Sequence, residues 1–199
     1  MAAPISQLSC LPPELPTGLT YLADFVTPAA AADLAQQINA APWRDDLKRR
    51  VQHYGYRYDY KARQARREDY LGPLPDFLNA LAHRLRDEGH FDSLPDQVIV
   101  NEYGAGQGIS AHVDCQPCFG EVIASLSLLS PCVMRLQHVG TGEIADLWLE
   151  PASLLILSGP ARHDWTHAIP ASHSDVIGGR KHPRARRVSL TFREMRFDG

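Results

Sequence analysis

The second half of the chain is a series of short apolar or alternating runs that are separated by Gly, Pro and Ser. Runs of this length and spacing are typical of the strands of a β-sandwich or a jelly roll. The predicted strands are residues 97–103, 122–128, 133–137, 144–149, 153–157 and 187–193. The series excludes an all-helical fold and predicts that most of this region is β-sheet.

Two helices are predicted ahead of these strands. The first covers residues 28–39, where Thr27 can cap the helix and a proline suits its first turn. The second covers residues 75–88, with apolar side chains at helical spacing and Gly89 as its stop. Residues 1–20 are rich in proline and are expected to follow an extended path on the surface. We therefore expect an α+β domain, with N-terminal helices on a C-terminal double-sheet core.

Composition narrows the classes of protein that remain. The 199 residues fit a single domain, and a net charge of -3 gives no global attraction to nucleic acid or to membranes. The N-terminus lacks the basic start and apolar run of a signal peptide, and the apolar stretches are too short to span a bilayer. Four cysteines do not suggest a disulfide scaffold. We expect a soluble, cytoplasmic, monomeric protein with reduced thiols and no membrane partner.

Candidate metal ligands occur in two separate segments. His112 and Asp114 are two residues apart, so in an extended segment they project from the same face. His167 follows more than fifty residues later, just after an apolar strand. Two histidines and one carboxylate on one face of an iron ion leave three positions open for other ligands. Taken alone, the pair also fits surface polar residues or a local hydrogen bond, and His163 is a rival third ligand.

The last predicted strand alternates strictly. Arg187, Ser189, Thr191 and Arg193 share one face, and apolar residues occupy the other. Inward-facing arginines require an anion, and a dicarboxylate such as 2-oxoglutarate offers each of them a bidentate partner. The alternative is a solvated edge strand whose outer residues are simply polar.

A second strand carries polar side chains that suit the same cavity. Asn101 and Tyr103 face one way in residues 97–103, so their amide and phenol can complete a carboxylate site. Tyr103 fits equally well as a core residue whose hydroxyl reaches water.

Together these segments resemble the AlkB family of Fe(II)- and 2-oxoglutarate-dependent dioxygenases, over roughly residues 97–195. The matching motifs are Asn101-x-Tyr103-x-x-Gly106-x-x-Ile109-x-x-His112-x-Asp114, then Trp165-x-His167-x-Ile169, then Arg187-x-Ser189-x-Thr191-x-Arg193. The resemblance implies a double-stranded β-helix (jelly-roll) core and the cofactors Fe(II), 2-oxoglutarate and O2. It also selects His167 rather than His163 as the third ligand.

The resemblance further assigns roles to the polar residues. It implies that Asn101, Tyr103 and Arg187 hold the distal carboxylate of 2-oxoglutarate, and that Arg193 lies near the 1-carboxylate and Asp114. Ser189 stands where the family usually has Asn, a change that leaves both arginines in place. The catalytic set that follows is His112, Asp114, His167 and Arg193.

Residues 44–67 are the most basic stretch of the chain, and aromatic residues interleave with the cations. Cations for phosphates and rings for stacking are what single-stranded or flipped bases require. By the resemblance this segment forms a nucleotide-recognition lid. The predicted substrate-binding residues are Arg49, Arg50, Gln52, His53, Tyr54 and Tyr56. The alternative is a hairpin whose tyrosines pack on the sheet.

The expected function is oxidative demethylation of alkylated bases in single-stranded DNA or RNA, that is, repair of nucleic-acid alkylation. Hydroxylation of a tRNA wobble uridine and a protein-directed demethylation remain as alternatives. The chain has no room for the RNA-recognition and methyltransferase domains of animal wobble enzymes, which favours a free-standing dealkylase. Cys115 and Cys118 form a lone CxxC beside the iron motif, which is weak evidence for a zinc site.

Overall fold

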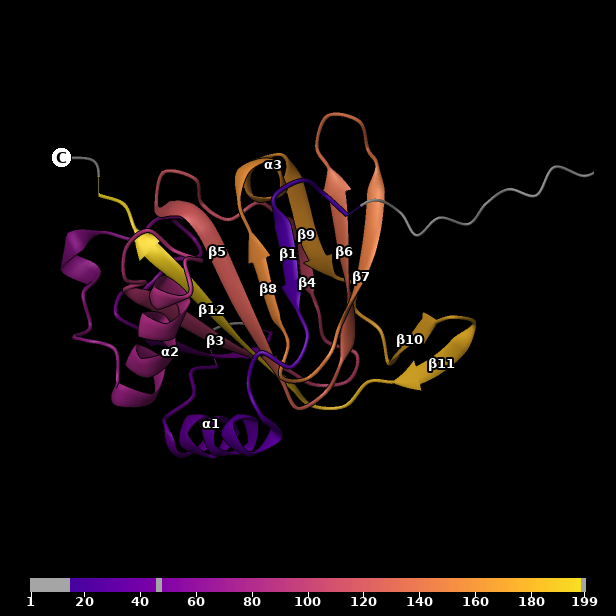
Figure 1. Cartoon of the computed structure of the whole chain (residues 1–199), viewed down its shortest axis with the longest axis horizontal. Coiled ribbons are helices and arrows are strands. Elements are labelled where there is room, and N and C mark those ends of the chain that lie inside the picture. The colour runs from indigo at the N-terminus through magenta and orange to yellow at the C-terminus, as the bar shows by residue number, and fades with distance from the viewer. Residues whose placement is uncertain (1–14, 46–47, 198–199) are drawn as a thin grey trace, which may run out of the picture.

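The computed structural model describes residues 15–45 and 48–197, and its core is two facing antiparallel sheets (Figure 1). The larger sheet has the strand order β1-β8-β5-β12-β3-β2, and the smaller has the order β4-β9-β6-β7. The larger sheet contains β1 (Leu19–Leu22), β2 (Arg50–Tyr54), β3 (Gln97–Tyr103), β5 (Phe119–Leu128), β8 (Leu154–Leu157) and β12 (Arg187–Met195). The smaller contains β4 (Ile109–His112), β6 (Cys132–His138), β7 (Ile144–Leu149) and β9 (Trp165–Ile169). Sheets that exchange strands in this order form a jelly roll.

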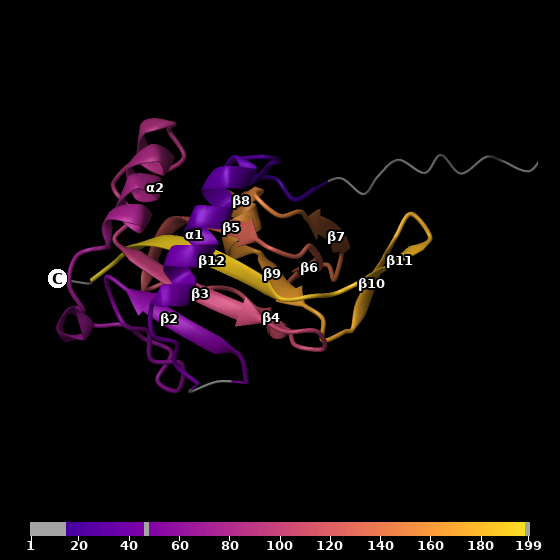
Figure 2. The same ribbon diagram turned by 90° about the horizontal axis from the view of Figure 1, so that it is seen from below.

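Two helices cover the outer face of the larger sheet (Figure 2). Helix α1 (Pro28–Ala40) begins after Thr27, whose hydroxyl accepts a hydrogen bond from the backbone of Ala30 at 3.2 Å. Helix α2 (Asp76–Asp87) ends before Gly89, which has a positive φ of 77°. Both helices occupy segments that the sequence predicts to be helical. Their apolar side chains pack with the outward residues of the sheet in one buried cluster that includes Leu34, Ile38, Leu78, Leu85, Val98, Val100, Leu126 and Leu190.

The pleat of β12 divides its side chains between the two layers. Val188, Leu190 and Phe192 join the helix-facing core, so the intervening residues point toward the smaller sheet. The register pairs Arg187 with Tyr103 across to β3. The strand is central, with β3 on one side and β5 on the other, so its polar face is buried rather than solvated. This excludes the solvated edge strand that the sequence alone allows.

Several elements give no clear signal in the sequence. Strand β1 has only four residues, and β10 (Ser174–Ile177) and β11 (Arg180–Pro183) form a hairpin that projects from the body (Figure 1). The hairpin is anchored at its base by a buried ion pair in which Arg184 donates to both carboxylate oxygens of Asp175 at 2.6 Å. Among the helices of the described residues, none is long and apolar enough to cross a membrane.

Candidate metal and co-substrate site

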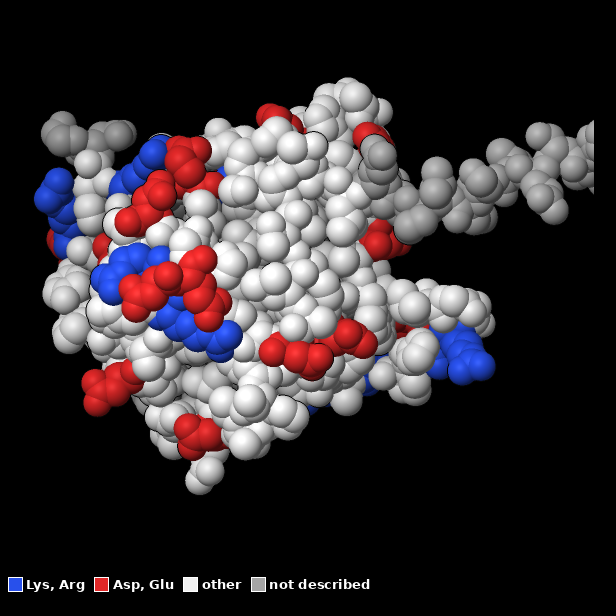
Figure 3. Space-filling view, viewed as in Figure 1, with Lys and Arg blue, Asp and Glu red and all other residues white. Residues whose placement is uncertain are grey.

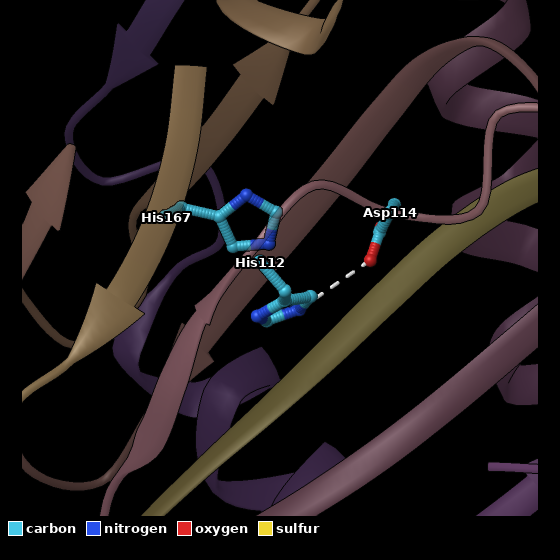
Figure 4. Close-up of side chains that lie close together, drawn as sticks. All are labelled: His112, Asp114 and His167. Carbon is cyan, nitrogen blue, oxygen red and sulfur yellow. Dashed lines mark ion pairs between the residues drawn. The ribbon is translucent and has the colours of Figure 1, made fainter. Parts of the chain in front are cut away.

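The three predicted metal ligands meet between the two sheets (Figure 4). His112 on β4 is the direct cross-strand partner of His167 on β9, and their ring centroids are 4.3 Å apart. Asp114 lies two residues beyond the end of β4. One ligand atom from each residue lies within 4.8 Å of the others. Two imidazoles and a carboxylate are the donor set that suits a non-haem iron ion with open positions.

Asp114 is held by its neighbours rather than by solvent. Its side chain is 7% exposed, and Arg193 donates from Nε to Oδ2 at 2.9 Å. Burial alone would raise the pKa of Asp114, but Arg193 and the two histidines hold that pKa well below its usual range. Oδ1 faces His112 Nε2 at 3.6 Å. The carboxylate is therefore ionised, with one oxygen directed to the ligand cluster and the other to the arginine.

The histidines are presented in the form that a metal requires. His112 donates from Nδ1 to the carbonyl oxygen of Ser110 at 2.8 Å, which leaves the Nε2 lone pair for a metal. Burial, followed by the charge of His112, lowers the pKa of His167 to about 4, so its ring is neutral at physiological pH. His163, the rival ligand, instead pairs through Nε2 with Glu121 at 2.7 Å and lies outside the cluster.

A buried arginine that the sequence pattern does not predict supports the metal loop. Arg162 in α3 (Gly159–His163) is 2% exposed and donates to the backbone carbonyl of Asp114 at 3.0 Å and of Cys115 at 3.4 Å. An arginine in a short loop helix looks like a surface residue, so no local pattern predicts this role.

A cavity of about 600 Å³ opens beside the ligand cluster, and the polar face of β12 lines it. Arg187 is 3% exposed and donates from Nη2 to Ser127 Oγ at 2.8 Å. Its Nε and Nη1 are buried and have no hydrogen-bond partner among the residues that the structure describes. Buried guanidinium donors require an acceptor, so these two atoms define a position for a carboxylate. The residues present therefore fit an anionic co-substrate such as 2-oxoglutarate.

Asn101, Tyr103 and Ser189 line the same cavity. The Arg187 guanidinium lies 5.6 Å from the centroid of the Tyr103 ring, and burial raises the pKa of that phenol. Ser189 Oγ lies 3.4 Å from Ser125 Oγ, so the shorter residue turns to a neighbouring strand. All three remain assigned to the co-substrate site by prediction, and their positions are consistent with that role.

Strand β2, at the edge of the larger sheet, divides the predicted substrate residues by its pleat. Arg49, directly before β2, reaches the cavity and donates from Nε to Asn101 Oδ1 at 2.7 Å. Arg50 points to the other face of the sheet, where Nε and Nη2 donate to the Glu102 carboxylate at 2.5 Å and 2.8 Å. Arg50 does not line the cavity. We assign it to the fold rather than to substrate binding.

Gln52 and Tyr54 share the outward face with Arg50. Gln52 is 3% exposed and donates from Nε2 to the carbonyl oxygens of Ile38 and Ala41 at the end of α1. Tyr54 packs edge-on against the Phe77 ring of α2, with centroids 6.2 Å apart. Neither side chain lines the cavity, so the structure corrects their predicted placement in a substrate site.

The two remaining predicted substrate residues, His53 and Tyr56, do not line the cavity. His53 is on the cavity side of β2 and meets the edge of the Tyr60 ring at 5.8 Å. Tyr56 packs between Tyr70 and Phe197, away from the cavity. Of the six predicted substrate-binding residues, Arg49 lines the cavity, and the other lid residues that line it are Lys48, Tyr58, Tyr60 and Arg63.

Cys115 and Cys118 form a disulfide directly after the Asp114 ligand. The expectation of reduced thiols is therefore wrong for this pair, while Cys132 is a buried free thiol. The two sulfur atoms lie 3.4 Å and 3.7 Å from the carbonyl oxygen of Arg63. A disulfide sulfur carries no proton to donate, so these are packing contacts between the metal loop and the rim.

Comparison with known proteins identifies the class that this site defines. Residues 18–193 match the model of the 2OG-Fe(II) oxygenase superfamily, and the chain belongs to that superfamily. Its members use Fe(II), 2-oxoglutarate and O2, which when bound supply the oxidising power for attack on a C–H bond.

Within the superfamily, several relatives of the chain are AlkB homologues. The chain is 37% identical to an Arabidopsis thaliana protein described as an alkylated DNA repair protein ALKBH8 homolog, over 90% of this chain and 58% of the relative. It is 37% identical to the Xenopus tropicalis tRNA (carboxymethyluridine(34)-5-O)-methyltransferase alkbh8, over 84% of this chain and 27% of that protein. The chain thus spans little more than half of the first relative and about a quarter of the second.

Solved structures share the fold at low sequence identity. The structure of OsALKBH1 superposes with a TM-score of 0.64 at 19% identity, covering 89% of this chain and 96% of that one. A prolyl-4-hydroxylase from Pseudomonas putida gives a TM-score of 0.58 at 19% identity, covering 92% of this chain and 94% of that one. These likenesses confirm the jelly-roll oxygenase fold.

Proposed function

We propose that the protein removes an alkyl group from a nucleobase in single-stranded DNA or RNA by oxidising it. The observation that carries the proposal is the composition of the cavity rim. Lys48, Arg49 and Arg63 bring cations to the mouth, and Tyr58 and Tyr60 bring aromatic rings. Cations attract the phosphates of a strand, and rings stack on a base that has left its neighbours.

The rings at the mouth are held for such a contact. Tyr58 and Tyr60 meet edge to face with centroids 5.2 Å apart, and Tyr58 also packs on Phe119 at 5.6 Å. Within the described part of the chain, the Tyr60 hydroxyl is buried without a hydrogen-bond partner, so it has a donor to offer an incoming group. A cavity of about 600 Å³ leaves room for a base beside the co-substrate.

The reaction balances with 2-oxoglutarate, O2 and the alkylated base as its only reactants. Decarboxylation of 2-oxoglutarate by O2 yields succinate and CO2, with one oxygen atom of O2 in succinate and the other inserted into the substrate C–H bond. The hydroxymethyl group on a base nitrogen then loses its hydroxyl proton as the C–N bond breaks, so formaldehyde leaves and the bonding electron pair stays on the nitrogen. The Arabidopsis relative is described as an alkylated DNA repair protein homolog, and this supports the same chemistry for the present chain.

A second candidate is the hydroxylation of a modified uridine in tRNA. The description of the Xenopus relative, which names carboxymethyluridine, favours it. That reaction inserts one oxygen atom and releases no carbon. The two candidates therefore differ in the mass of the product.

The test is mass spectrometry of nucleosides after the protein is incubated with Fe(II), 2-oxoglutarate and ascorbate. The substrates are 1-methyladenine oligonucleotides of DNA and RNA, and tRNA with modified wobble uridines. Loss of a methyl group, absent in His112→Ala, is the expected result. Gain of one oxygen on tRNA alone assigns the protein to the second candidate. Consumption of 2-oxoglutarate with no change in any nucleoside contradicts both and directs the search to protein substrates.

A further inference from the structure

A second depression, of about 500 Å³, lies beside the catalytic cavity. Three stretches of chain enclose it, namely residues 62–68 of the rim, residues 117–118 beside the disulfide, and residues 196–197 after β12. Four of its side chains are arginines, and we refer to it as the arginine pocket. These arginines are Arg63, Arg66, Arg67 and Arg196.

The arginine pocket carries more positive charge than its carboxylates balance. Arg196 pairs with Glu121 at 2.7 Å, and Arg66 approaches Glu68 at 3.7 Å with both side chains more than half exposed. Among the residues that the structure describes, no carboxylate forms an ion pair with Arg63 or Arg67. The excess is local, because the whole chain has a net charge of -3. A local cationic site on an acidic protein points to an anionic ligand.

Hydrogen bonds and packing hold this part of the rim in shape. The backbones of Asp59 and Gln64 exchange two hydrogen bonds, at 2.9 Å and 3.3 Å. The Asp69 carboxylate accepts from the backbone of Arg66 at 2.9 Å, and the Arg67 guanidinium lies 5.2 Å from the Phe197 ring centroid. The cations are thus presented by an ordered surface, which lowers the entropy lost on binding.

Arg63 connects the two sites, because it lines both the catalytic cavity and the arginine pocket. We propose that the arginine pocket binds phosphodiester groups of a single-stranded nucleic acid whose modified base occupies the catalytic cavity. The inference rests on the proposed function, since it needs a base attached to a strand. Arginine suits this role because its planar fork binds two phosphate oxygens at once.

The tip of the β10–β11 hairpin is a rival basic surface (Figure 3). Its available cations are Arg180 and Lys181, because Arg184 forms a buried ion pair with Asp175. Its neighbour Val176 is 65% exposed, and no described residue of the hairpin lines the catalytic cavity. The arginine pocket has more cations and adjoins the cavity, so it is the better site for the strand.

The test is the salt dependence of binding to a fluorescein-labelled, unmodified single-stranded oligonucleotide, read by fluorescence anisotropy. The slope of log affinity against log salt is negative, and each phosphate contact of a single strand adds about 0.7 to its magnitude, which is the quantity compared between variants. We expect the double variant Arg66→Ala, Arg67→Ala to lower that slope by about 1.4. The matched double variant Arg180→Ala, Lys181→Ala and the remote Arg86→Ala should keep the slope of the wild type.

Two further measurements guard the result. The variant Arg66→Lys, Arg67→Lys keeps the charge and should keep most of the slope, while unchanged 2-oxoglutarate consumption without nucleic acid shows that the alanine variant is folded. An unchanged slope in the alanine variant, a loss confined to the hairpin variant, or a wild type that does not bind the oligonucleotide would each overturn the proposal. Binding is read without turnover, so a protein that binds through the pocket and modifies no base refutes only the proposed function.

Discussion

Arg187 and Arg193 stand on the same face of one strand, yet their surroundings give them different tasks. Arg193 already has a carboxylate, because its Nε donates to the Asp114 side chain. Arg187 donates to a serine hydroxyl, and two of its buried donors find no partner in residues 15–45 and 48–197. Arg193 therefore orients a metal ligand, whereas Arg187 is placed to bind an anion that comes from outside the chain.

Replacing Arg187 by Lys should weaken the binding of 2-oxoglutarate. Lysine keeps the charge but loses the planar fork, and the loss of a hydrogen bond to a charged group costs about 1.5–3 kcal/mol. We expect the KM for 2-oxoglutarate to rise by about tenfold to a hundredfold, since 1.4 kcal/mol corresponds to a factor of ten. The measurement is succinate formation against 2-oxoglutarate concentration. Equal KM values in the variant and the wild type would show that Arg187 does not contact the co-substrate.

A pair of histidine variants separates the two candidate third ligands. His167→Ala removes a donor from the cluster and should abolish stoichiometric iron binding. His163→Ala removes only a partner of Glu121 at the surface and should leave one iron per chain. Iron bound after anaerobic reconstitution, measured by elemental analysis, checks both expectations. Iron retained in His167→Ala but lost in His163→Ala would reverse the assignment.

At the scale of single residues, the sequence predicts the metal ligands better than it predicts the residues that hold those ligands in place. His112 and Asp114 come together as their spacing predicts, although β4 ends at His112 and Asp114 is held beyond the strand by Arg193. The choice between His163 and His167 needs the pairing of β4 with β9, which residue spacing does not contain. Arg162 is buried by contacts with a segment 47 residues away, so nothing in its neighbourhood distinguishes it from a surface arginine.

Among the elements, β2 is a strand whose cavity-facing side cannot be predicted from its residue types. Both of its faces carry polar and aromatic residues, so periodicity gives no preference for one face. Its pairing with β3 sets Val51 opposite Asn101 on the cavity side and Gln52 opposite Val100 on the helix side. A shift of one residue in this register would exchange the two sets.

Replacing Gln52 by Ala should destabilise the protein without changing its co-substrate affinity. The variant removes the amide donor of the Ala41 carbonyl oxygen and one of the two donors of the Ile38 carbonyl oxygen, and an unsatisfied buried group costs about 1–3 kcal/mol. Urea unfolding should show the loss at an unchanged m-value. The KM for 2-oxoglutarate should equal that of the wild type. A raised KM with unchanged stability would return Gln52 to the substrate-binding set.

The longer elements are predicted well because their signals are local and redundant. In α1 the Thr27 cap, the first-turn proline and the apolar spacing agree with one another. In β3 and β12 the side-chain pattern runs without interruption, and the predicted and observed starts of the strands coincide. Strands β1, β10 and β11 have four residues each, and they exist because of their partners rather than their own pattern.

For the whole molecule, Glu102 joins layers that are far apart in the sequence. Its carboxylate accepts from Arg50 of β2 and from Arg186 before β12, each at 2.5 Å. Arg186 also donates to Asn39 of α1 at 2.5 Å. One partly buried charge thus ties the edge strand, the central strand and a helix together.

The stability of the fold should depend on pH through this carboxylate. Hydrogen bonds from Arg50 lower the pKa of Glu102 below its ordinary 4.5, so the folded state favours the ionised form. The contribution of Glu102 to stability is therefore complete at neutral pH and is lost as the pH falls through the lowered pKa. Melting temperatures between neutral pH and about pH 3.5 should fall less steeply in Glu102→Gln than in the wild type. Parallel curves would show that the ion pairs do not contribute.

The bond between Cys115 and Cys118 makes the choice of buffer part of the biochemistry. Ferrous enzymes are handled with reductants, and a thiol reductant opens a disulfide by exchange, giving up two electrons and ending as its own disulfide. Ascorbate does not work by this exchange. Samples prepared in the two reagents would therefore carry different covalent structures one residue from Asp114. Rates measured in one cannot be compared with rates in the other until the free thiols of each sample have been counted.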